Sequence, residues 1–404
     1  MKRMLKVFGL SLGMITLVGL VLAVFNIDRL KRLHAVNTLF AEEKIVANFS
    51  NMKGAFAFAP IVENGDVEPW ESQLKPLPES FHQNGTEKST KEWLDASKTT
   101  SYIVVQDGII TYEDYRLGTK PDDLRMSWSV AKAFLSAAFG IAVEDGLIDL
   151  NDSVDKYVPA LKNSAYKGVT VRNVLNMSSG VKFDENYQDF WSDIKKMGRV
   201  LAIGGSMDEF SIDVKERERE QGIARKYVSI DTHVLSMVLR AATGKRLIAY
   251  VGEKIVSPIG FERSPYFITD SEGNAFALGG LNVTSRDYAR FAQMILNKGM
   301  WQGKQIVPAK WVTDSTAPTA KKDLENDGWG YGYQWWMPPN SSKNGGDFLA
   351  RGFNGQYLYI NPTSRTVVVR TAANAKSRQP LIDGSTAHQN NIALFRAIAS
   401  SGDK

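Results

Sequence analysis

Cysteine is absent from this 404-residue sequence, and histidine occurs only at His34, His82, His233 and His388. Without cysteine the chain can form no disulfide framework, no thiolate nucleophile and no thiolate-bound zinc site. A Ser-His-Asp triad is not expected, because no Gly-x-Ser-x-Gly turn is present and His233 reads as a surface or helix-capping residue. His-Glu-x-x-His and other zinc-ligand clusters are also missing. We therefore expect neither a metal nor a cofactor.

Signals for nucleotide or nucleic-acid binding are missing as well. The sequence has no Gly-x-x-x-x-Gly-Lys loop and no dinucleotide-binding fingerprint. Its formal net charge of +5 is small and dispersed, and no run of Lys and Arg is interleaved with aromatic residues, so nucleic acid is not an expected partner. The length and a hydrophobic share of 43% instead indicate a globular protein of one large domain or two smaller ones.

The N-terminus combines a basic start with a long apolar run. Met1–Lys6 is basic, and Val7–Phe25 contains no charge. This run approaches the roughly 20 residues that span a bilayer and exceeds the apolar core of about 7–15 residues in a signal peptide. We therefore expect residues 1–30 to form an uncleaved transmembrane signal anchor, with the catalytic domain periplasmic or at the cell surface. Cleavage after Ala23 is the alternative, and it would give a secreted protein.

The next segment, residues 31–90, is irregular in pattern and rich in proline, which predicts a tether and a strap laid over the following domain. Two β-rich runs, Ser101–Val105 and Ile109–Tyr115, then flank Asp107-Gly108, a dipeptide typical of a tight hairpin. Strand patterns return late in the chain: Phe348–Arg351, Tyr357–Ile360 and Thr366–Thr371.

Helical patterns dominate the middle of the chain. Apolar periodicity predicts the following helices: Lys91–Ser97, Val171–Met177, Ile230–Ala242, Ser285–Asn297 and Asn390–Ser400. Ser285 is the expected N-cap of its helix.

Strands at both ends with helices between them indicate an α+β domain over residues 91–404. We expect one antiparallel sheet that is formed by both ends of the chain and flanked by helices. This sheet would belong to a lobe made of residues 91–155 and 330–404. Residues 156–329 would form an inserted, mostly helical lobe.

One helix of this domain carries a polar pair in an apolar setting. The stretch Ser127–Gly146 is apolar nearly all round, which is typical of a core helix. Ser129 and Lys132 stand three residues apart at its start, so their side chains share a face. A buried lysine needs a partner, and a serine beside such a lysine is a nucleophile with its base. Helix capping by Ser129 or Ser127 is the alternative.

The Ser-x-x-Lys spacing also occurs at two other places. Ser72 and Lys75 lie in the predicted strap, and Ser192 and Lys195 lie in a polar loop. Only Ser129 opens a buried helix, where the helix dipole would stabilise an oxyanion.

Two further segments contain groups suited to catalysis. Tyr227-Val-Ser229 places a phenol and a hydroxyl just before a helix, and a tyrosine near cations can accept or relay a proton. A half-buried packing tyrosine is the alternative. Ala350–Gln356 has two glycines around a strand end, where a backbone N–H can approach a ligand and serve an oxyanion hole. An ordinary β-turn is the alternative there.

In this order the three segments resemble the serine β-lactamase and penicillin-binding-protein superfamily. The resemblance is strongest to its class-C-like branch of esterases and 6-aminohexanoate-dimer hydrolases, and it extends over roughly residues 50–400. These stretches carry it: Ser127–Lys132, Val174–Gly180, Tyr227–Asp231, Gly330–Trp336 and Arg351–Gln356.

The resemblance implies an acyl-enzyme mechanism. Ser129 would be the acylated nucleophile, and Lys132 and Tyr227 would share the proton transfers. The oxyanion hole would consist of the backbone N–H groups of Ser129 and Gln356.

Substrate-binding residues are implied in the same way. Ser229 stands where the family commonly has asparagine, Gly355 and Gln356 belong to the third motif, and Tyr187 lies in a loop where related amide hydrolases contact their substrates. The aromatic residues of Trp329–Trp336 either line the pocket or pack in the core.

The third motif departs from the pattern of the family. It is commonly Lys-Thr-Gly, whereas this chain has Phe353-Asn354-Gly355, so the lysine that helps to bind a β-lactam or peptidyl carboxylate is missing. Arg351 is near in sequence but need not face the site.

The prediction is therefore a serine hydrolase for small-molecule ester or amide substrates, associated with the membrane through its N-terminal helix. A β-lactamase or DD-peptidase is the alternative enzyme, and an inactive penicillin-binding or sensor-like module is the alternative of another class. The oligomeric state is not indicated.

Overall fold

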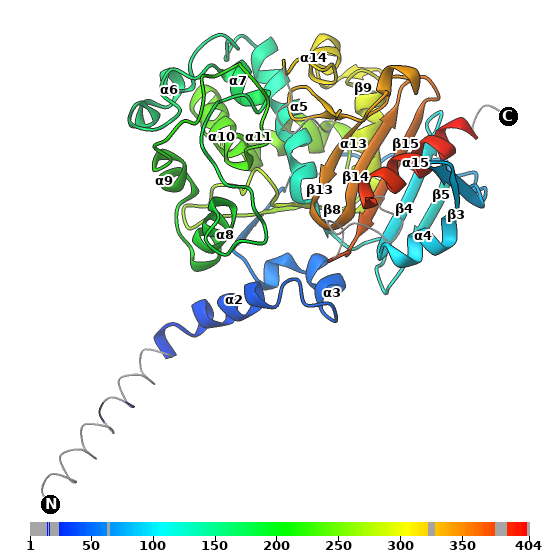
Figure 1. Cartoon of the computed structure of the whole chain (residues 1–404), viewed down its shortest axis with the longest axis horizontal. Coiled ribbons are helices and arrows are strands. Elements are labelled where there is room, and N and C mark those ends of the chain that lie inside the picture. The colour runs from blue at the N-terminus through cyan, green and yellow to red at the C-terminus, as the bar shows by residue number, and fades with distance from the viewer. Residues whose placement is uncertain are drawn as a thin grey trace, which may run out of the picture.

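A seven-stranded antiparallel sheet frames one half of the protein in the computed structural model (Figure 1). The structure describes residues 14, 16, 24–62, 65–321, 328–375 and 386–401. In spatial order the strands are β11 (Gly330–Tyr331), β12 (Trp336–Met337), β13 (Phe348–Gly352), β14 (Gln356–Asn361), β15 (Thr366–Ala372), β4 (Thr99–Gln106) and β5 (Ile109–Tyr115). Because β15 pairs with β4, the prediction of one antiparallel sheet formed by both ends of the chain is confirmed.

The two faces of this sheet enter separate hydrophobic cores, since successive side chains of a strand point to opposite faces. Tyr359 of β14 packs against α15 (Ala387–Ser400) on one face. Leu358 belongs to the larger core on the other face, which α13 (Ser285–Leu296) covers. Thus α13 packs on the sheet, although the predicted boundary at residues 156–329 grouped it with the helical lobe.

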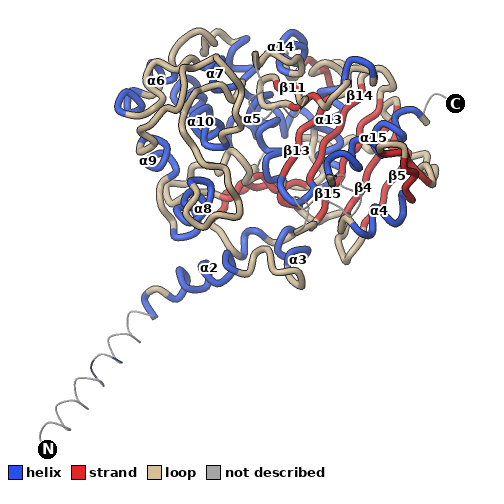
Figure 2. Tube along the Cα trace, in the orientation of Figure 1, coloured by secondary structure: helices blue, strands red, loops and turns tan. Residues whose placement is uncertain are grey.

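The other helices lie mainly beside the sheet, in the left half of Figure 1, and Figure 2 shows few strands among them. They are α5 (Ala131–Glu144), α6 (Val154–Tyr157), α7 (Val171–Leu175), α8 (Asp193–Ile203), α9 (Met207–Ile212), α10 (Ser229–Thr243), α11 (Leu247–Val251), α12 (Ser257–Ile259) and α14 (Ala309–Ser315). Helix α4 (Thr90–Ala96) lies instead at the right of Figure 1, next to β4. Short 3-10 or π turns complete the helical segments: Met52–Gly54, Trp128–Val130, Pro159–Asn163, Gly252–Val256, Ser341–Lys343 and Phe353–Gly355.

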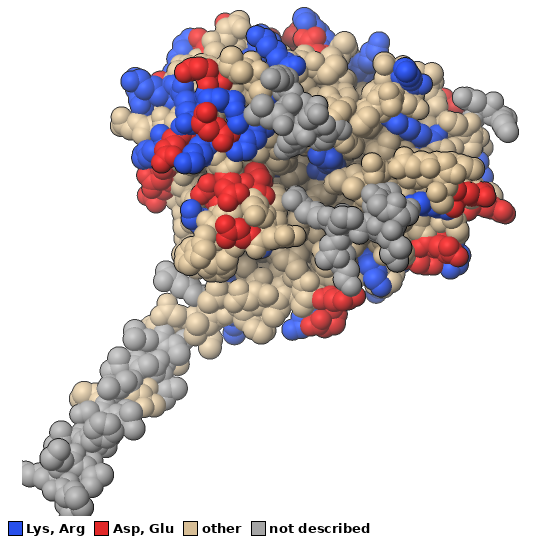
Figure 3. Space-filling view, viewed as in Figure 1, with Lys and Arg blue, Asp and Glu red and all other residues tan. Residues whose placement is uncertain are grey.

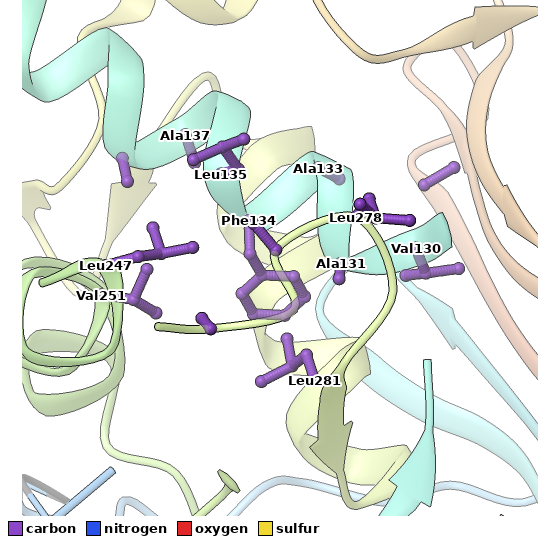
Figure 4. Close-up of a cluster of buried hydrophobic side chains, with 14 of the residues drawn as sticks. Val130, Ala131, Ala133, Phe134, Leu135, Ala137, Leu247, Val251, Leu278 and Leu281 are labelled. Atoms are coloured by element: carbon purple, nitrogen blue, oxygen red, sulfur yellow. The ribbon is translucent and has the colours of Figure 1, made fainter. Parts of the chain in front are cut away.

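Helix α5 is the central helix of the larger core. Twelve of its fourteen residues are buried, as its apolar composition predicts. Figure 4 shows Phe134 of α5 directed toward Leu247 and Val251 of α11 and toward Leu281. On another face Gly140 lies directly against the indole of Trp311.

Hydroxyl side chains begin several of these helices, because they accept hydrogen bonds from otherwise unpaired N–H groups. Ser192 Oγ accepts from Lys195 N–H at the start of α8. Thr284 Oγ1 accepts from Asp287 N–H at the start of α13, so the prediction of Ser285 as this N-cap is wrong by one residue. Gly244 ends α10 with φ +69°, a conformation that glycine adopts without strain.

Shorter strands connect the two halves. A four-stranded sheet has the order β1 (Phe58–Pro60), β7 (Tyr266–Ile268), β8 (Leu281–Val283) and β6 (Arg125–Met126). The hairpins are β2 (Ser80–Gln83) with β3 (Thr86–Ser89), and β9 (Met300–Trp301) with β10 (Lys304–Gln305). Strand β6 ends directly before Ser127, so this small sheet positions the start of α5.

The N-terminal segment is more regular than the sequence predicts. Helices α2 (Ile27–Asn37) and α3 (Ile45–Phe49), together with β1, β2 and β3, replace much of the irregular strap expected for residues 31–90. An extended part does run beside β5, where Gln73 N–H donates to Ile110 O over 2.9 Å and Lys75 N–H to Thr111 O over 2.8 Å.

No helix within the described residues is both long enough and apolar enough to cross a bilayer. The predicted transmembrane anchor, residues 1–30, falls largely outside those residues. The structure therefore does not support the anchor, and it stays a prediction.

Charged side chains of both signs are interspersed over the face drawn in Figure 3, most densely over the helical half. This mixed pattern agrees with the small formal net charge of +5.

Candidate active site

A strained turn carries Ser129. Trp128–Val130 forms one 3-10 turn between β6 and α5. Trp128 has φ +45°, a left-handed conformation that costs a bulky residue about 1–3 kcal/mol. Its ring packs edge-on against Phe49, at 5.7 Å between ring centroids, and against Phe353, at 5.9 Å. These contacts hold the turn and so direct the side chain of Ser129.

The other two predicted catalytic residues, Lys132 and Tyr227, converge on the Ser129 hydroxyl. Lys132 Nζ donates to Ser129 Oγ over 2.9 Å, and Tyr227 Oη donates to the same oxygen over 3.0 Å. Lys132 Nζ also lies 5.2 Å from the centroid of the Tyr227 ring. Ser129 Oγ is thus held by two groups that can each move a proton, while Ser127 Oγ turns back to Trp128 O. Helix capping by either serine is not what the structure shows.

Lys132 is buried at 2% exposure in the first turn of α5. Besides Ser129, its ammonium donates to Leu278 O over 2.8 Å. A buried charge is stable only when such partners satisfy it. The carbonyl of Leu278 therefore fixes the lysine side chain toward the nucleophile.

Tyr227 lies on an aromatic and cationic stack. Its ring stacks on Trp336, with centroids 5.5 Å apart and an interplanar angle of 29°. The guanidinium of Arg225 lies 4.9 Å from the centroid of the Trp336 ring, and that of Arg351 lies 3.7 Å from it. Arg351 also contacts Trp329, at 4.5 Å. Trp336 is thus a buried ring that positions a predicted catalytic side chain.

The end of strand β13 lies against the turn that carries Ser129. A Cβ atom on Gly352 would be 2.5 Å from Ser127 O and 3.1 Å from the Trp128 Cβ atom, so only glycine fits at this position. The next residue, Phe353, follows at once with its ring beside Trp128. The strand end therefore reaches the region in which an oxyanion donor is needed.

The two predicted third-motif residues lie one turn further along, at the β13–β14 connection. Gly355 has φ +97°, and a Cβ there would be 2.7 Å from Arg370 Nη1. The Gln356 side chain is buried, donating to Ala372 O over 2.7 Å and to Phe353 O over 3.1 Å. Both residues thus shape the connection, and the side chain of Gln356 is directed into the sheet.

Ser229 and Tyr187 meet a buried carboxylate near Lys132. Ser229 is the first residue of α10, and its N–H donates to Glu185 Oε1. Burial raises the pKa of Glu185, while the Ser229 N–H and the charge of Lys132 act in the opposite direction. The Tyr187 ring stacks on Phe353 at 5.1 Å and 14°. Both predicted binding residues therefore lie beside the catalytic group.

Two ionisable groups of α10 are bonded to residues other than Ser129. Asp231 Oδ1 accepts from Tyr166 Oη over 2.7 Å, and burial raises the pKa of Asp231 to about 8. His233 is 1% exposed and its Nε2 lies 2.8 Å from Asp208 Oδ1. The expectation of a surface or capping histidine is wrong, because α9 covers this face of α10.

Sequence reasoning missed Glu185 and the ring of Phe353, and it left Trp336 open between pocket and core. Glu185 lies two residues before Tyr187 in a stretch without periodicity, so its local pattern does not indicate burial. For Phe353 the motif pattern indicates only the replacement of a lysine. The aromatic density of Trp329–Trp336 was the one available signal for Trp336.

Most of this chain is similar to known proteins. The family model described as "Beta-lactamase" matches residues 95–388. A 6-aminohexanoate-dimer hydrolase of Paenarthrobacter ureafaciens is 27% identical over 292 residues, which cover 69% of this chain and 74% of that protein.

Solved structures are similar over longer stretches. A Bacillus anthracis protein inferred to be a 6-aminohexanoate-dimer hydrolase has a TM-score of 0.79 and 26% identity, covering 90% of this chain and 95% of the other. A family VIII carboxylesterase has a TM-score of 0.54 and 16% identity, covering 77% and 96%. The second likeness is one of fold.

Proposed function

Because the chain belongs to the beta-lactamase family of hydrolases and penicillin-binding proteins, we propose that it is a serine hydrolase that cleaves ester or small amide bonds through an acyl-enzyme. One observation carries the proposal: Ser129 Oγ accepts hydrogen bonds from both Lys132 Nζ and Tyr227 Oη. A nucleophile within hydrogen-bond reach of its base is the arrangement that covalent catalysis needs.

In the acylation step, Ser129 Oγ bonds to the substrate carbonyl carbon and loses its proton to the Lys132–Tyr227 pair. The pair can accept this proton only if Lys132 or Tyr227 is deprotonated when the substrate binds. The bond from the carbonyl carbon to the leaving oxygen or nitrogen then breaks, and the pair returns the proton to the leaving group. An acyl-Ser129 ester remains.

Deacylation repeats these transfers with water. A water molecule beside Tyr227 and Lys132 gives a proton to the pair while its oxygen bonds to the acyl carbon. The ester bond to Ser129 Oγ breaks, and the proton returns to this oxygen. The free acid and the starting enzyme result.

The negative charge on the carbonyl oxygen needs two N–H donors in both steps. The backbone N–H of Ser129 is one. The predicted second donor is Gln356 N–H. Phe353 N–H is another candidate, because Gly352 lies against the Ser129 turn and Phe353 follows it directly.

Two features support an ester or a small amide over a β-lactam or a peptidyl carboxylate. The lysine of the usual third motif is replaced in Phe353-Asn354-Gly355. The nearby Arg351 guanidinium contacts the rings of Trp336 and Trp329.

Hydrolysis of p-nitrophenyl esters by the full chain tests the proposal, with intact mass to detect the acyl adduct. We expect turnover and an adduct in the wild type and neither in Ser129→Ala. Ser192→Ala is the matched control, because Ser192 belongs to another Ser-x-x-Lys but only caps α8, a role worth about 1 kcal/mol of stability.

Undiminished turnover in Ser129→Ala would overturn the mechanism. Slow, stable acylation by penicillins without ester turnover would instead support a β-lactamase, a DD-peptidase or a penicillin sensor. We also propose the predicted membrane location, which fractionation of cells producing the full chain would test.

A further inference from the structure

The segment before the matched family region is built into the domain. Residues 27–61 precede the matched residues 95–388, and we call residues 27–61 the N-terminal arm. Its side chains Leu39, Ile45, Phe49 and Met52 are buried in the larger core at 0–3% exposure. Figure 1 shows α2 and α3 of the arm along the lower edge of the domain. Such burial makes the arm part of the folded domain.

A buried arginine fixes this arm relative to the nucleophile. Arg125 is fully buried in β6, four residues before Ser129. Its Nη1 donates to Val46 O over 2.8 Å and to Ser50 Oγ over 2.6 Å. Because β6 leads directly into the Trp128 turn, the same strand end positions both the arm and Ser129.

Phe40 of the arm extends a row of aromatic rings beside Ser129. Its ring stacks on Trp128 at 5.7 Å and 25°, and meets Phe353 edge-on at 5.6 Å and 85°. Phe353 stacks in turn on Tyr187. Each ring is partly exposed, Phe40 at 37%, so the row offers an apolar surface beside the nucleophile.

We propose that Phe40 is a specificity-determining residue, which completes an apolar wall and selects substrates with an alkyl or aryl group next to the scissile carbonyl. The inference rests on the proposed hydrolase function and adds its substrate class. The wall is made by Phe40, Trp128, Phe353 and Tyr187. An alkyl or aryl group of the substrate would be buried against these rings by apolar contact. Apolar burial gains roughly 25 cal/mol per Å² of surface removed from water, so longer groups gain more from Phe40.

The test compares esters that differ only in apolar length. One series varies the acyl chain from acetate to octanoate on p-nitrophenol, and the other varies the alcohol of acetate esters from methyl to octyl. In Phe40→Ala we expect kcat/KM for the longest member of one series to fall about tenfold, with p-nitrophenyl acetate hydrolysis nearly unchanged. The series that responds identifies which side of the ester contacts the wall.

Matched variants separate specificity from folding. Phe58→Ala removes another exposed phenylalanine of the arm, which lies in β1 and packs on Tyr266 of β7, and it should leave both length profiles unchanged. Phe40→Tyr keeps the aromatic ring and should therefore retain the wild-type dependence of kcat/KM on chain length. Acetate turnover reports in the same assay that Phe40→Ala is folded.

The two proposals fail in different ways. If Phe40→Ala hydrolyses all esters with the wild-type length profile, or loses acetate and octanoate equally while folded, this inference is overturned and the hydrolase function stands. If the wild type hydrolyses no ester, the hydrolase function itself fails.

Discussion

The role of Lys132 is directly testable, because its side-chain nitrogen donates to Ser129 Oγ and to Leu278 O. Lys132→Met keeps a straight side chain of similar length in the apolar slot but removes the proton carrier. We expect kcat/KM for p-nitrophenyl acetate to fall by about 10²–10⁴, with little change in thermal stability. Lys195→Met, in the Ser-x-x-Lys of α8, should retain activity. A Lys132→Met enzyme with a tenth or more of wild-type activity would contradict the role of the lysine.

The roles of the ring and of the hydroxyl of Tyr227 can be tested separately. Tyr227→Phe keeps the stack on Trp336 and removes only the donor to Ser129 Oγ. We expect a loss of about 10² or more in kcat/KM at unchanged stability. Tyr331→Phe is the control, since Tyr331 packs on the same Trp336 ring and its Oη has no partner in the described part of the chain. Equal effects of the two changes would mean that packing, not proton transfer, is lost.

At this scale the sequence predicts the Ser129–Lys132 pair well, because three residues on a helix fix their separation. Tyr227 is 98 residues from Ser129, so only the order of motifs could join it to them. Glu185 and Phe40 could not be found, since their positions depend on how a loop and an arm fold over the domain.

Among the elements, α5 shows packing overruling helix propensity. Gly140→Ala would normally stabilise a helix interior by about 1 kcal/mol. Here the new Cβ would lie 2.3 Å from Trp311 Cδ1, and such overpacking costs about 1–3 kcal/mol. We expect a lower Tm for Gly140→Ala and a higher Tm for Gly198→Ala in α8, whose Cβ meets nothing within 4 Å. Thermal unfolding of both variants checks this, and a rise for Gly140→Ala would refute the packing argument.

Elements with a continuous apolar face were predicted within a few residues of their true bounds. The strands β4, β5, β14 and β15 and the helices α10 and α13 belong to this group. Strands β4, β14 and β15 are buried on both faces, so they show up in the sequence as short β-rich runs between turn residues. Helix α3 escaped prediction. It has only five residues, of which Ile45 and Phe49 are buried, so the segment is too short to show a helical period.

For the whole molecule, stability should depend on pH through Asp231. Its pKa is raised by burial from 3.8 to about 8, so the folded protein holds this proton more tightly than the unfolded chain. The resulting stability is complete below about pH 4 and is lost as the pH rises toward 8, by at most about 1.4 kcal/mol per pH unit. Tyr166, Ser179 and Glu185 are the groups that face it.

Asp231→Asn removes this titration while keeping the shape of the side chain. Urea unfolding between pH 5 and 8 should show a flatter dependence of the unfolding free energy on pH in the variant. All other groups titrate in both proteins, so the difference between the two slopes isolates Asp231. Identical slopes would show that Asp231 is already ionised in the folded protein at pH 5.

The pairing of β15 with β4 also determines when the protein can fold. The hydroxyls of Thr100 and Thr371 are 2.7 Å apart and yet 271 residues apart in sequence. Contacts of such range form slowly, because the entropy cost of closing a long loop comes before the strand pairing that offsets it. During synthesis, β4 and β5 must wait for nearly the whole chain before they gain their inner neighbour. We therefore expect the Ser129 turn, which contacts β13, to acquire its working shape among the last events of folding.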